Sequence, residues 1–350
     1  MKRTGKILSL VIALTLVLTL FAGCGSNSEP SSAPESTAPE SSNTESTAPE
    51  SATPSVNWPE KTVNIIVPYG AGGDTDMNAR TLADKLAQKT GGTFIVTNIS
   101  GNGGATGALE ALSSDPDGYT ILFHHTGFIV NQLTGASSYT YDDVEFAAIV
   151  GRSAGNIITM KASLGINTLD ELIAYTQAHP GELKIAANTG ATTHATALML
   201  RKIGVDVKMV DAGASTERIS ALLGGHVDII VNPINTIADY LKTGELVALC
   251  TDNDTVSEAL RDQYGVLPGA EQGYDLGLPF YYTMMFPKGT DQAIIDKLDG
   301  LLEDIILNDT EYQDAIYKAY LQVPCYYNSE DGMKIMKEAY DKLSTLDFNA

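Results

Sequence analysis

The chain has 350 residues, of which 43% are hydrophobic and 7% aromatic, and its formal net charge is −21 at pH 7. This charge disfavours nucleic-acid binding, because proteins that neutralise phosphates need a surplus of lysine and arginine. The chain is long for a single hydrophobic core and suits a protein with two lobes.

The N-terminus has the features of an export signal. Residues 1–23 join the basic side chains Lys2, Arg3 and Lys6 to an apolar stretch that hydroxyl residues interrupt, and this stretch is too short for a comfortable membrane span. We therefore predict a signal peptide. The stretch ends LFAGC, which resembles the bacterial lipoprotein box and identifies Cys24 as the acylated, palmitate-bearing first residue of the mature protein. Ordinary signal cleavage with an incidental Cys24 is the alternative.

Residues 24–57 are predicted to form a disordered linker. The stretch consists mainly of Ser, Thr, Pro, Ala and Glu, contains no aromatic residue, and repeats the letters ESTAPES from Glu35 and again from Glu45. Such a composition buries too little apolar surface to fold. We expect an extended tether between a lipid anchor and a folded body, although proline-rich segments also serve as peptide ligands.

The folded part opens with a buried strand, a glycine-rich turn and an amphipathic helix. The apolar run 63–67 suits a parallel strand, and Pro68 ends it because proline lacks the N–H that a sheet needs. The glycines of the turn, at positions 70, 72 and 73, let backbone N–H groups approach a ligand, and Asp74 or Thr75 is expected to cap the helix. Free N–H groups at the positive end of a helix dipole favour a carboxylate or phosphate. A turn with glycines for steric reasons alone is the alternative.

Strand and helix patterns then alternate along the rest of the chain. We predict strands at 94–98, 120–123, 146–150, 157–160, 184–187, 207–210, 227–231, 247–250 and 281–287, and helices that include 193–203, 215–223, 292–307, 310–321 and 330–343. This rhythm predicts an α/β fold with mixed or parallel sheets flanked by helices. We expect one lobe from residues 58–154 plus 254–350 and a second lobe from 155–253.

Ligands of open α/β sheets bind beyond the carboxyl ends of strands, so the turns there are the candidates for a site. These turns are 69–75, 124–131, 188–194, 211–216 and 232–235, and none contains Arg or Lys. An anion is therefore expected to be held by local dipoles against the unfavourable overall charge of the protein. No metal site is predicted, because His124 and His125 point in opposite directions on a strand. Cys250 and Cys325 lack metal spacing and form either one disulfide or two separate thiols.

Six motifs in order make the chain resemble a known family. They are VPYGAGGDTD, NISGNGGATGA, DPDGYTIL, IAANTGATTHATALML, DAGASTERISALLGGHVDII and MMFPKGT. The chain is similar over residues 58–350 to the receptors of tripartite tricarboxylate transporters, the TctC or Bug proteins of bacteria. The resemblance implies a two-lobed type II periplasmic-binding-protein fold of the Venus-flytrap kind. It also implies a monomer without a cofactor or enzymatic activity, lipid-anchored outside the cytoplasm, which captures a small di- or tricarboxylate and delivers it to transporter membrane subunits.

The resemblance also implies a set of binding residues. From the first lobe they are Tyr69, Ala71, Gly72, Gly73, Thr75, His125, Thr126 and Asn131, and from the second lobe Asn188, Thr189, Gly190, Thr193 and His194. Asp76 is expected to secure the first turn rather than touch the ligand. Two positions depart from the family pattern, because Asp74 is commonly uncharged there and Ile99 stands where many relatives have arginine. A purely structural role for His194 is the alternative to ligand contact.

Two other functions remain open at this level. A solute sensor that signals to a membrane kinase would have the same cleft and anchor. A nucleotide-cofactor enzyme is suggested by SGNGGATGA, but Thr106 breaks the GxGxxG fingerprint. The sequence also lacks a GxSxG elbow and an HExxH pair, which argues against an enzyme.

Overall fold

The structure, a computed structural model, describes residues 56–348; the predicted signal peptide, Cys24 and nearly all of the predicted linker lie outside the described residues. The strands in this range are β1 (Val63–Val67), β2 (Phe94–Asn98), β3 (Thr120–His125), β4 (Val144–Arg152), β5 (Asn156–Lys161), β6 (Lys184–Ala186), β7 (Lys208–Val210), β8 (Ile229–Pro233), β9 (Leu246–Thr251) and β10 (Tyr281–Pro287). The helices are α1 (Asp74–Thr90), α2 (Ala105–Leu112), α3 (Gly127–Leu133), α4 (Leu169–Ala178), α5 (Thr192–Lys202), α6 (Ser215–Leu223), α7 (Ile234–Thr243), α8 (Glu258–Tyr264), α9 (Gln292–Asn308), α10 (Thr310–Tyr320) and α11 (Ser329–Leu343).

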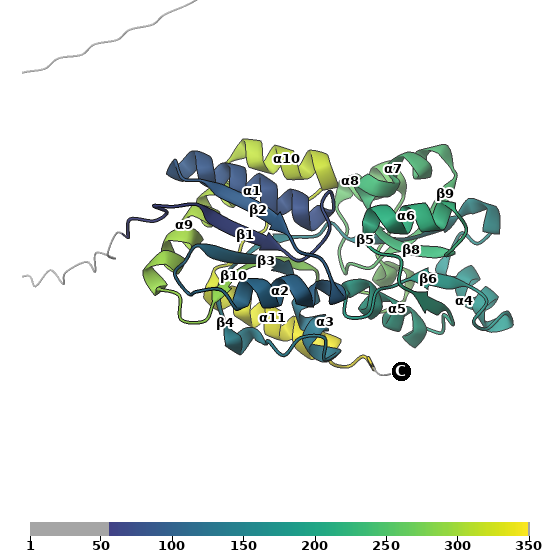
Figure 1. Cartoon of the computed structure of the whole chain (residues 1–350). Coiled ribbons are helices and arrows are strands. Elements are labelled where there is room, and N and C mark those ends of the chain that lie inside the picture. Colours follow the sequence, from purple (N-terminus) through teal and green to yellow (C-terminus); the bar gives the residue numbers. More distant parts are fainter. Residues whose placement is uncertain (1–55, 349–350) are drawn as a thin grey trace, which may run out of the picture. The chain divides into compact units, whose positions relative to one another are not determined.

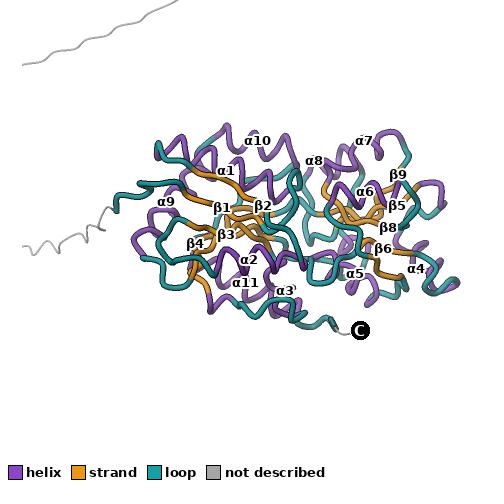
Figure 2. Tube along the Cα trace, in the orientation of Figure 1, coloured by secondary structure: helices purple, strands orange, loops and turns teal. Residues whose placement is uncertain are grey.

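The strands form two five-stranded mixed sheets. The first has the order β2-β1-β3-β10-β4, in which β1 pairs in parallel with β2 and β3 while β10 runs antiparallel to its neighbours. The second has the order β7-β6-β8-β5-β9, in which β5 is antiparallel to both neighbours. We call each sheet with its flanking helices a lobe, the first and the second (Figures 1 and 2). The predicted α/β class with two mixed sheets is confirmed.

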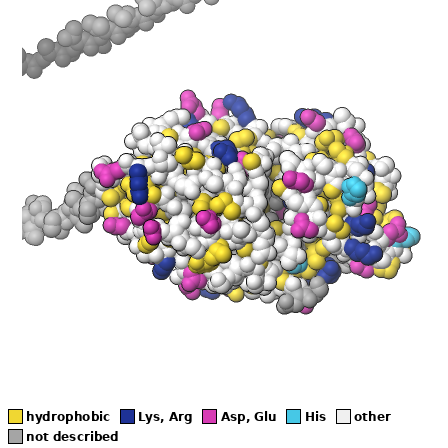
Figure 3. Space-filling model, viewed as in Figure 1, with side chains coloured by type: hydrophobic (Ala, Val, Ile, Leu, Met, Phe, Trp, Pro, Cys, Tyr) yellow, Lys and Arg dark blue, Asp and Glu magenta, His cyan; other side chains and the backbone are white. Residues whose placement is uncertain are grey.

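Helices cover both faces of each sheet. Alternate side chains of one strand therefore pack into hydrophobic clusters on opposite faces of its sheet. In β5, Ile158 and Met160 pack into the main hydrophobic cluster, whereas Ile157 packs into a smaller cluster under α6 and α7. This alternation follows from the period of two residues along a strand. Figure 3 shows acidic side chains spread over both lobes on one face, interspersed with basic ones. Within residues 56–348, no helix is both long and apolar enough to cross the membrane.

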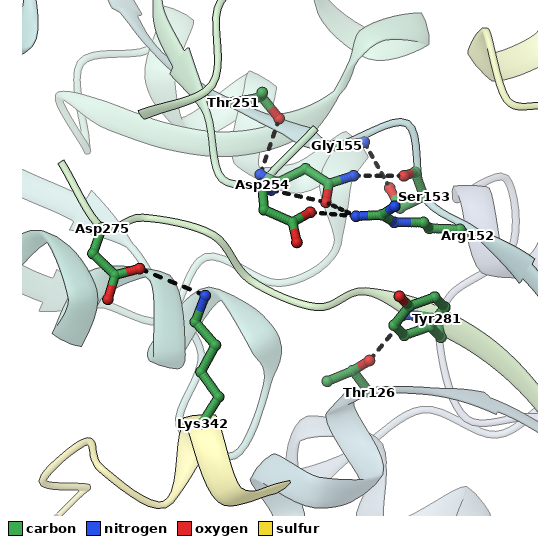
Figure 4. A network of polar contacts seen from close by, with 10 residues as sticks. Thr126, Arg152, Ser153, Gly155, Thr251, Asp254, Asp275, Tyr281 and Lys342 are labelled. Atoms are coloured by element: carbon green, nitrogen blue, oxygen red, sulfur yellow. Dashed lines mark hydrogen bonds and ion pairs between the residues drawn. The ribbon is translucent and has the colours of Figure 1, made fainter. Parts of the chain in front are cut away.

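The chain passes between the lobes where β4 leads into β5. Gly155 has φ +108°, and a Cβ there would lie 2.0 Å from the Thr251 hydroxyl oxygen, so only glycine fits. The Ser153 N–H donates to the Phe280 carbonyl (3.0 Å), and the Asn253 side-chain amide donates to the Ser153 carbonyl (2.9 Å). Figure 4 shows these crossing segments together. Helix α8, which follows the return crossing, packs on α7 of the second lobe. The lobe boundaries at 154/155 and 253/254 stay a prediction.

Several local expectations are wrong. Residues 124–131 are not a turn, because β3 continues to His125 and α3 begins at Gly127. The expected turn at 232–235 is absent, since β8 leads directly into α7. Helix α1 has Gly73 as its N-cap, with no side-chain cap from Asp74 or Thr75. For Cys250 and Cys325 the second of the two alternatives holds, because both are free thiols.

Asp252, in the crossing segment after β9, gives a pH prediction. Burial raises the pKa of its carboxyl to about 7, although hydrogen bonds from the Thr196 hydroxyl (3.0 Å) and the Asn156 N–H (3.0 Å) oppose the shift. The raised pKa means that this carboxyl stabilises the fold below pH ~4 and that the contribution is lost as the pH rises through ~7. The difference in unfolding free energy between Asp252→Asn and the wild type is therefore expected to change with pH. From pH 5 to pH 8 it should shift by about 2 kcal/mol in favour of the variant.

Urea unfolding at pH 5 and pH 8 measures this difference. Asp314→Asn, on the exposed surface of α10, is the control and is expected to follow the wild type at both pH values. An Asp252→Asn variant whose stability relative to the wild type does not change with pH would contradict the prediction.

Candidate functional site

Four helices begin at one cavity, two from each lobe. The N-caps of α1, α2, α5 and α6 are Gly73, Gly104, Ala191 and Ala214, and all four line the cavity. None has a side-chain cap, so the first backbone N–H groups of α1, α5 and α6 remain available to a ligand. At α2 the N–H groups of Ala105 and Thr106 donate instead to the carbonyls of Asn102 and Gly101 in the preceding turn. Together with the positive ends of four helix dipoles, they make the cavity a favourable place for an anion.

Helices that begin elsewhere are mostly capped in the usual way. Their capping residues are Thr168 on α4, Ser257 on α8, Asp291 on α9, Asp309 on α10 and Asn328 on α11, and each side chain accepts a backbone N–H. Helices α3 and α7 also begin without a side-chain cap. Glycine or alanine at the starts of α1, α5 and α6 therefore leaves open donors that Ser, Thr, Asp or Asn would close.

The cavity has a volume of about 410 Å³ and is lined from both lobes. Seven of the residues proposed from the sequence line it, namely Tyr69, Gly73, Thr75, His125, Asn188, Thr189 and Thr193. This volume lies within the range of small-molecule sites. The structure thus brings more than half of the proposed residues together around one space.

Four of the remaining six proposed residues do not line the cavity. Ala71 and Gly72 are exposed and do not line the cavity. Thr126 exchanges hydrogen bonds with the Tyr281 backbone, at 3.0 and 3.1 Å, and so fixes the start of β10. His194 is buried, and its ring packs edge-on against that of Phe348.

The other two, Asn131 and Gly190, join the lobes. The Asn131 side-chain amide donates to the carbonyls of Gly190 in the second lobe (2.7 Å) and of Gly103 in the first (3.0 Å). At this point the backbones nearly touch, because a Cβ on Gly103 would lie 2.5 Å from the Gly190 carbonyl carbon. The structure therefore has its lobes in contact beside the cavity.

Asp76 holds the first turn. Its carboxylate accepts hydrogen bonds from the Gly72 N–H (2.9 Å), the Arg80 guanidinium (3.1 Å) and the Asn98 amide (2.9 Å). Burial acts to raise the pKa of Asp76, but these donors outweigh it and lower the pKa. The side chain is 4% exposed and lies outside the cavity lining.

Arg218 is the cation of the site and adds a charged side chain to the local dipoles that were expected from the sequence. It donates to the Asn232 side-chain oxygen (2.9 Å), the Gly213 carbonyl (3.1 Å) and the Ser215 hydroxyl (3.1 Å). These bonds fix the guanidinium against the cavity and leave one N–H on each terminal nitrogen for a ligand. Burial lowers the pKa of Arg218 to about 10, and the charge of Asp74 opposes this, so the side chain stays charged at neutral pH.

Asp74 also lines the cavity and is not a helix cap. Its carboxylate accepts a hydrogen bond from the Tyr282 hydroxyl (2.5 Å), and that hydroxyl accepts one from the buried Gln322 amide (3.2 Å). Burial raises the pKa of Asp74, while the Tyr282 hydrogen bond and the charge of Arg218 oppose the shift. An acidic side chain thus faces a cavity whose helices and Arg218 favour anions.

Aromatic rings form one side of the cavity. The His125 ring stacks on Tyr69 (centroids 4.3 Å apart) and packs on Phe280 (4.5 Å). Its Nδ1 accepts the Gly127 N–H (2.8 Å), and burial holds the pKa of His125 well below its usual value. The neutral ring therefore carries its hydrogen on Nε2 as a donor. Within the described residues, no cluster of three His, Cys, Asp or Glu side chains could hold a metal ion.

The lining also includes residues that were not predicted from the sequence, namely Arg218, Asp74, Phe280 and the loop of residues 100–104. Arg218 lies two residues beyond the candidate turn 211–216, on the first turn of α6. The loop follows β2, which pairs in parallel with β1, so its glycines lie at the same sheet edge as the first turn. The rule that ligands bind beyond the carboxyl ends of strands could therefore have identified this loop from the sequence. No sequence signal indicates the orientation of the Asp74 side chain.

The two-lobed fold with an anion-favouring cavity lined from both lobes defines the class of solute-binding proteins. The sequence model of the tripartite tricarboxylate transporter family receptor, TctC, matches residues 78–346. The chain belongs to this family, which confirms the resemblance and places it among extracytoplasmic receptors rather than enzymes.

Individual relatives agree with this assignment. The chain is 30% identical over 295 residues to the UPF0065 protein in gbd 5'region of Cupriavidus necator, which covers 81% of this chain and 86% of the relative. It is 30% identical over 257 residues to BugT of Bordetella pertussis, covering 71% of this chain and 77% of BugT. A structure of MatC from Rhodopseudomonas palustris with bound malate has the same fold, with TM-score 0.73, 20% identity and coverage of 82% of this chain and 99% of MatC.

Proposed function

We propose that the chain is an extracytoplasmic solute-binding lipoprotein that captures a small organic carboxylate between its two lobes. The carboxylate is of the di- or tricarboxylate class, and the protein, a monomer, delivers it to the membrane subunits of a tripartite tricarboxylate-type transporter. The observation that carries the proposal is the convergence of four uncapped helix N-termini and Arg218 on one cavity. MatC, a structural neighbour, holds malate.

The proposed ligand contacts divide between the lobes. The first lobe contributes backbone N–H groups around Gly73 and Thr75 and the His125 Nε2 donor. The second contributes Arg218 and the segment 188–193 at the start of α5. Charge-assisted bonds from a guanidinium are stronger than neutral ones, so Arg218 is proposed to hold a carboxylate directly.

Membrane attachment through lipid on Cys24 is part of the proposal. Labelling of the full-length chain by a radioactive fatty acid, abolished by Cys24→Ser, is the expected result. Label that persists in Cys24→Ser would contradict it.

Ligand binding is expected to raise the melting temperature of the full-length protein. A carboxylate present at 100 times its Kd adds about 2.7 kcal/mol to the unfolding free energy, which corresponds to about 5 °C for a protein of this size. Thermal unfolding with mono-, di- and tricarboxylates at rising concentration measures the shift, which should saturate. No shift with any carboxylate at millimolar concentration, together with a shift for an uncharged solute, would overturn the proposed function.

A further inference from the structure

Two side chains of opposite charge line the cavity, and the proposed function gives a role to only one of them, Arg218. Asp74 comes from α1 of the first lobe and Arg218 from α6 of the second, and both line the cavity. They form no ion pair with each other within 4.0 Å, although each perturbs the pKa of the other. The two charges therefore face a common space without neutralising one another.

Other buried groups hold the Asp74 side chain in place. Tyr282 is fully buried in β10, and its hydroxyl accepts a hydrogen bond from Gln322 and so directs its own hydrogen to Asp74. Asp74 thus receives a hydrogen bond as a carboxylate does, and it is fixed against the cavity. A side chain held by a buried hydroxyl that is itself held by a buried amide is preorganised to bind rather than to reach solvent.

The charged side chains of the cavity lining favour a ligand with both an ammonium group and a carboxylate over one with carboxylates alone. Its ionisable side chains include the acids Asp74 and Asp211 and the single cation Arg218, beside the neutral His125. A ligand with carboxylates alone would place negative charge in the space that Asp74 faces, and a buried charge without a partner is costly. A ligand with an ammonium group would pair with Asp74 while its carboxylate pairs with Arg218 and the helix N-termini.

We propose, resting on the carboxylate-binding function above, that the ligand carries a protonated amine as well as a carboxylate, as amino acids do. Asp74 binds the amine from the first lobe, and Arg218 binds a carboxylate from the second. Because the two contacts come from different lobes, a zwitterion joins the lobes through both of its charges. Asp74 is then the specificity-determining residue of the site.

Three pairs of probes that differ only in an amino group test this assignment, namely succinate and aspartate, glutarate and glutamate, and propionate and alanine. Calorimetric titration of the full-length protein gives a Kd for each. In at least one pair the amino compound is expected to bind about 10-fold or more tightly, and Asp74→Asn is expected to reduce that ratio to about twofold or less. A ratio that Asp74→Asn leaves unchanged would overturn the assignment, as would equal or tighter binding of every compound without the amine.

Two further variants keep the test decisive. Asp211→Asn removes the other acid of the lining and is expected to retain the preference; loss of the preference there instead would assign the amine to Asp211 and sink the proposal. Tyr282→Phe keeps the buried ring but removes the hydroxyl that holds Asp74, so it should lower the preference even where Asp74→Asn folds poorly.

The two proposals fail differently. Binding of succinate and glutarate in preference to their amino partners would leave the carboxylate-binding function standing and overturn only the amine assignment. Absence of binding for all six compounds at millimolar concentration would overturn the amine assignment, and the same absence for the tricarboxylates of the thermal screen would overturn both.

Discussion

Replacing Arg218 by glutamine is expected to weaken carboxylate binding about 30- to 150-fold. The substitution removes the only arginine or lysine of the cavity lining and its charge-assisted hydrogen bonds, which corresponds to about 2–3 kcal/mol. The helix N-termini and the His125 donor remain, so binding is weakened rather than abolished. Calorimetric titration of the variant with the tightest carboxylate of the wild type measures the loss.

Arg261→Gln is the matched control for this change. Arg261 lies in α8 of the chain, is paired with the exposed Glu271 (2.6 Å), and does not line the cavity. Its loss is expected to leave the Kd within about twofold, since an exposed ion pair contributes little. The ligand-free melting temperature of Arg218→Gln shows whether the variant is folded. If it is folded and binds the carboxylate as tightly as Arg261→Gln does, Arg218 has no part in ligand binding.

Replacing Gly103 by alanine is expected to weaken ligand binding about 100-fold by hindering closure. The new Cβ would meet the Gly190 carbonyl carbon at 2.5 Å and oxygen at 2.8 Å, and backbone atoms cannot rotate away as a side chain does. Overpacking of this kind costs about 1–3 kcal/mol, and it arises only when the lobes meet. A smaller closed population lowers the apparent affinity in proportion.

Gly135→Ala separates closure from backbone strain. Gly135 has φ +69°, close to the +66° of Gly103, but a Cβ there meets nothing within 4 Å. Both variants therefore carry the cost of alanine in the left-handed region, and only Gly103→Ala adds the contact with Gly190. Small-angle scattering should show a ligand-induced decrease in radius for Gly135→Ala and none for Gly103→Ala at the same ligand concentration. Equal compaction of both would refute the argument.

Most of the fold was predictable because hydrophobic period and turn residues are local signals. The predicted strands at 94–98 and 281–287 have the same bounds as β2 and β10, and the C-terminal helices were found within about one residue. Helix α3 was missed because it is only seven residues long and begins two residues after the end of β3, so it is too short to show a helical period that separates it from the strand. That error placed Asn131 in a turn facing the ligand, whereas the helix directs it to the other lobe.

The site was predictable to the extent that it consists of backbone at strand ends. Gly73, Thr75 and the lining residues Asn188, Thr189 and Thr193 lie in turns that are found from the rule that ligands bind beyond parallel strands. Arg218 and Asp74 depend on side-chain direction, which the partners Asn232 and Tyr282 set from strands remote in sequence. Such long-range partners leave no pattern in a local stretch of sequence.

The division of the four helix N-termini between the lobes has a kinetic consequence. A ligand held by α1 and α2 on one side and α5 and α6 on the other leaves only after the lobes separate, so its residence time is set by the opening rate. Opening would break the Asn131 hydrogen bond to Gly190 and withdraw the donors of one lobe at once. A membrane protein that grips the two lobes and pulls them apart would therefore convert a tight receptor into a weak one in a single motion, without any competing solute.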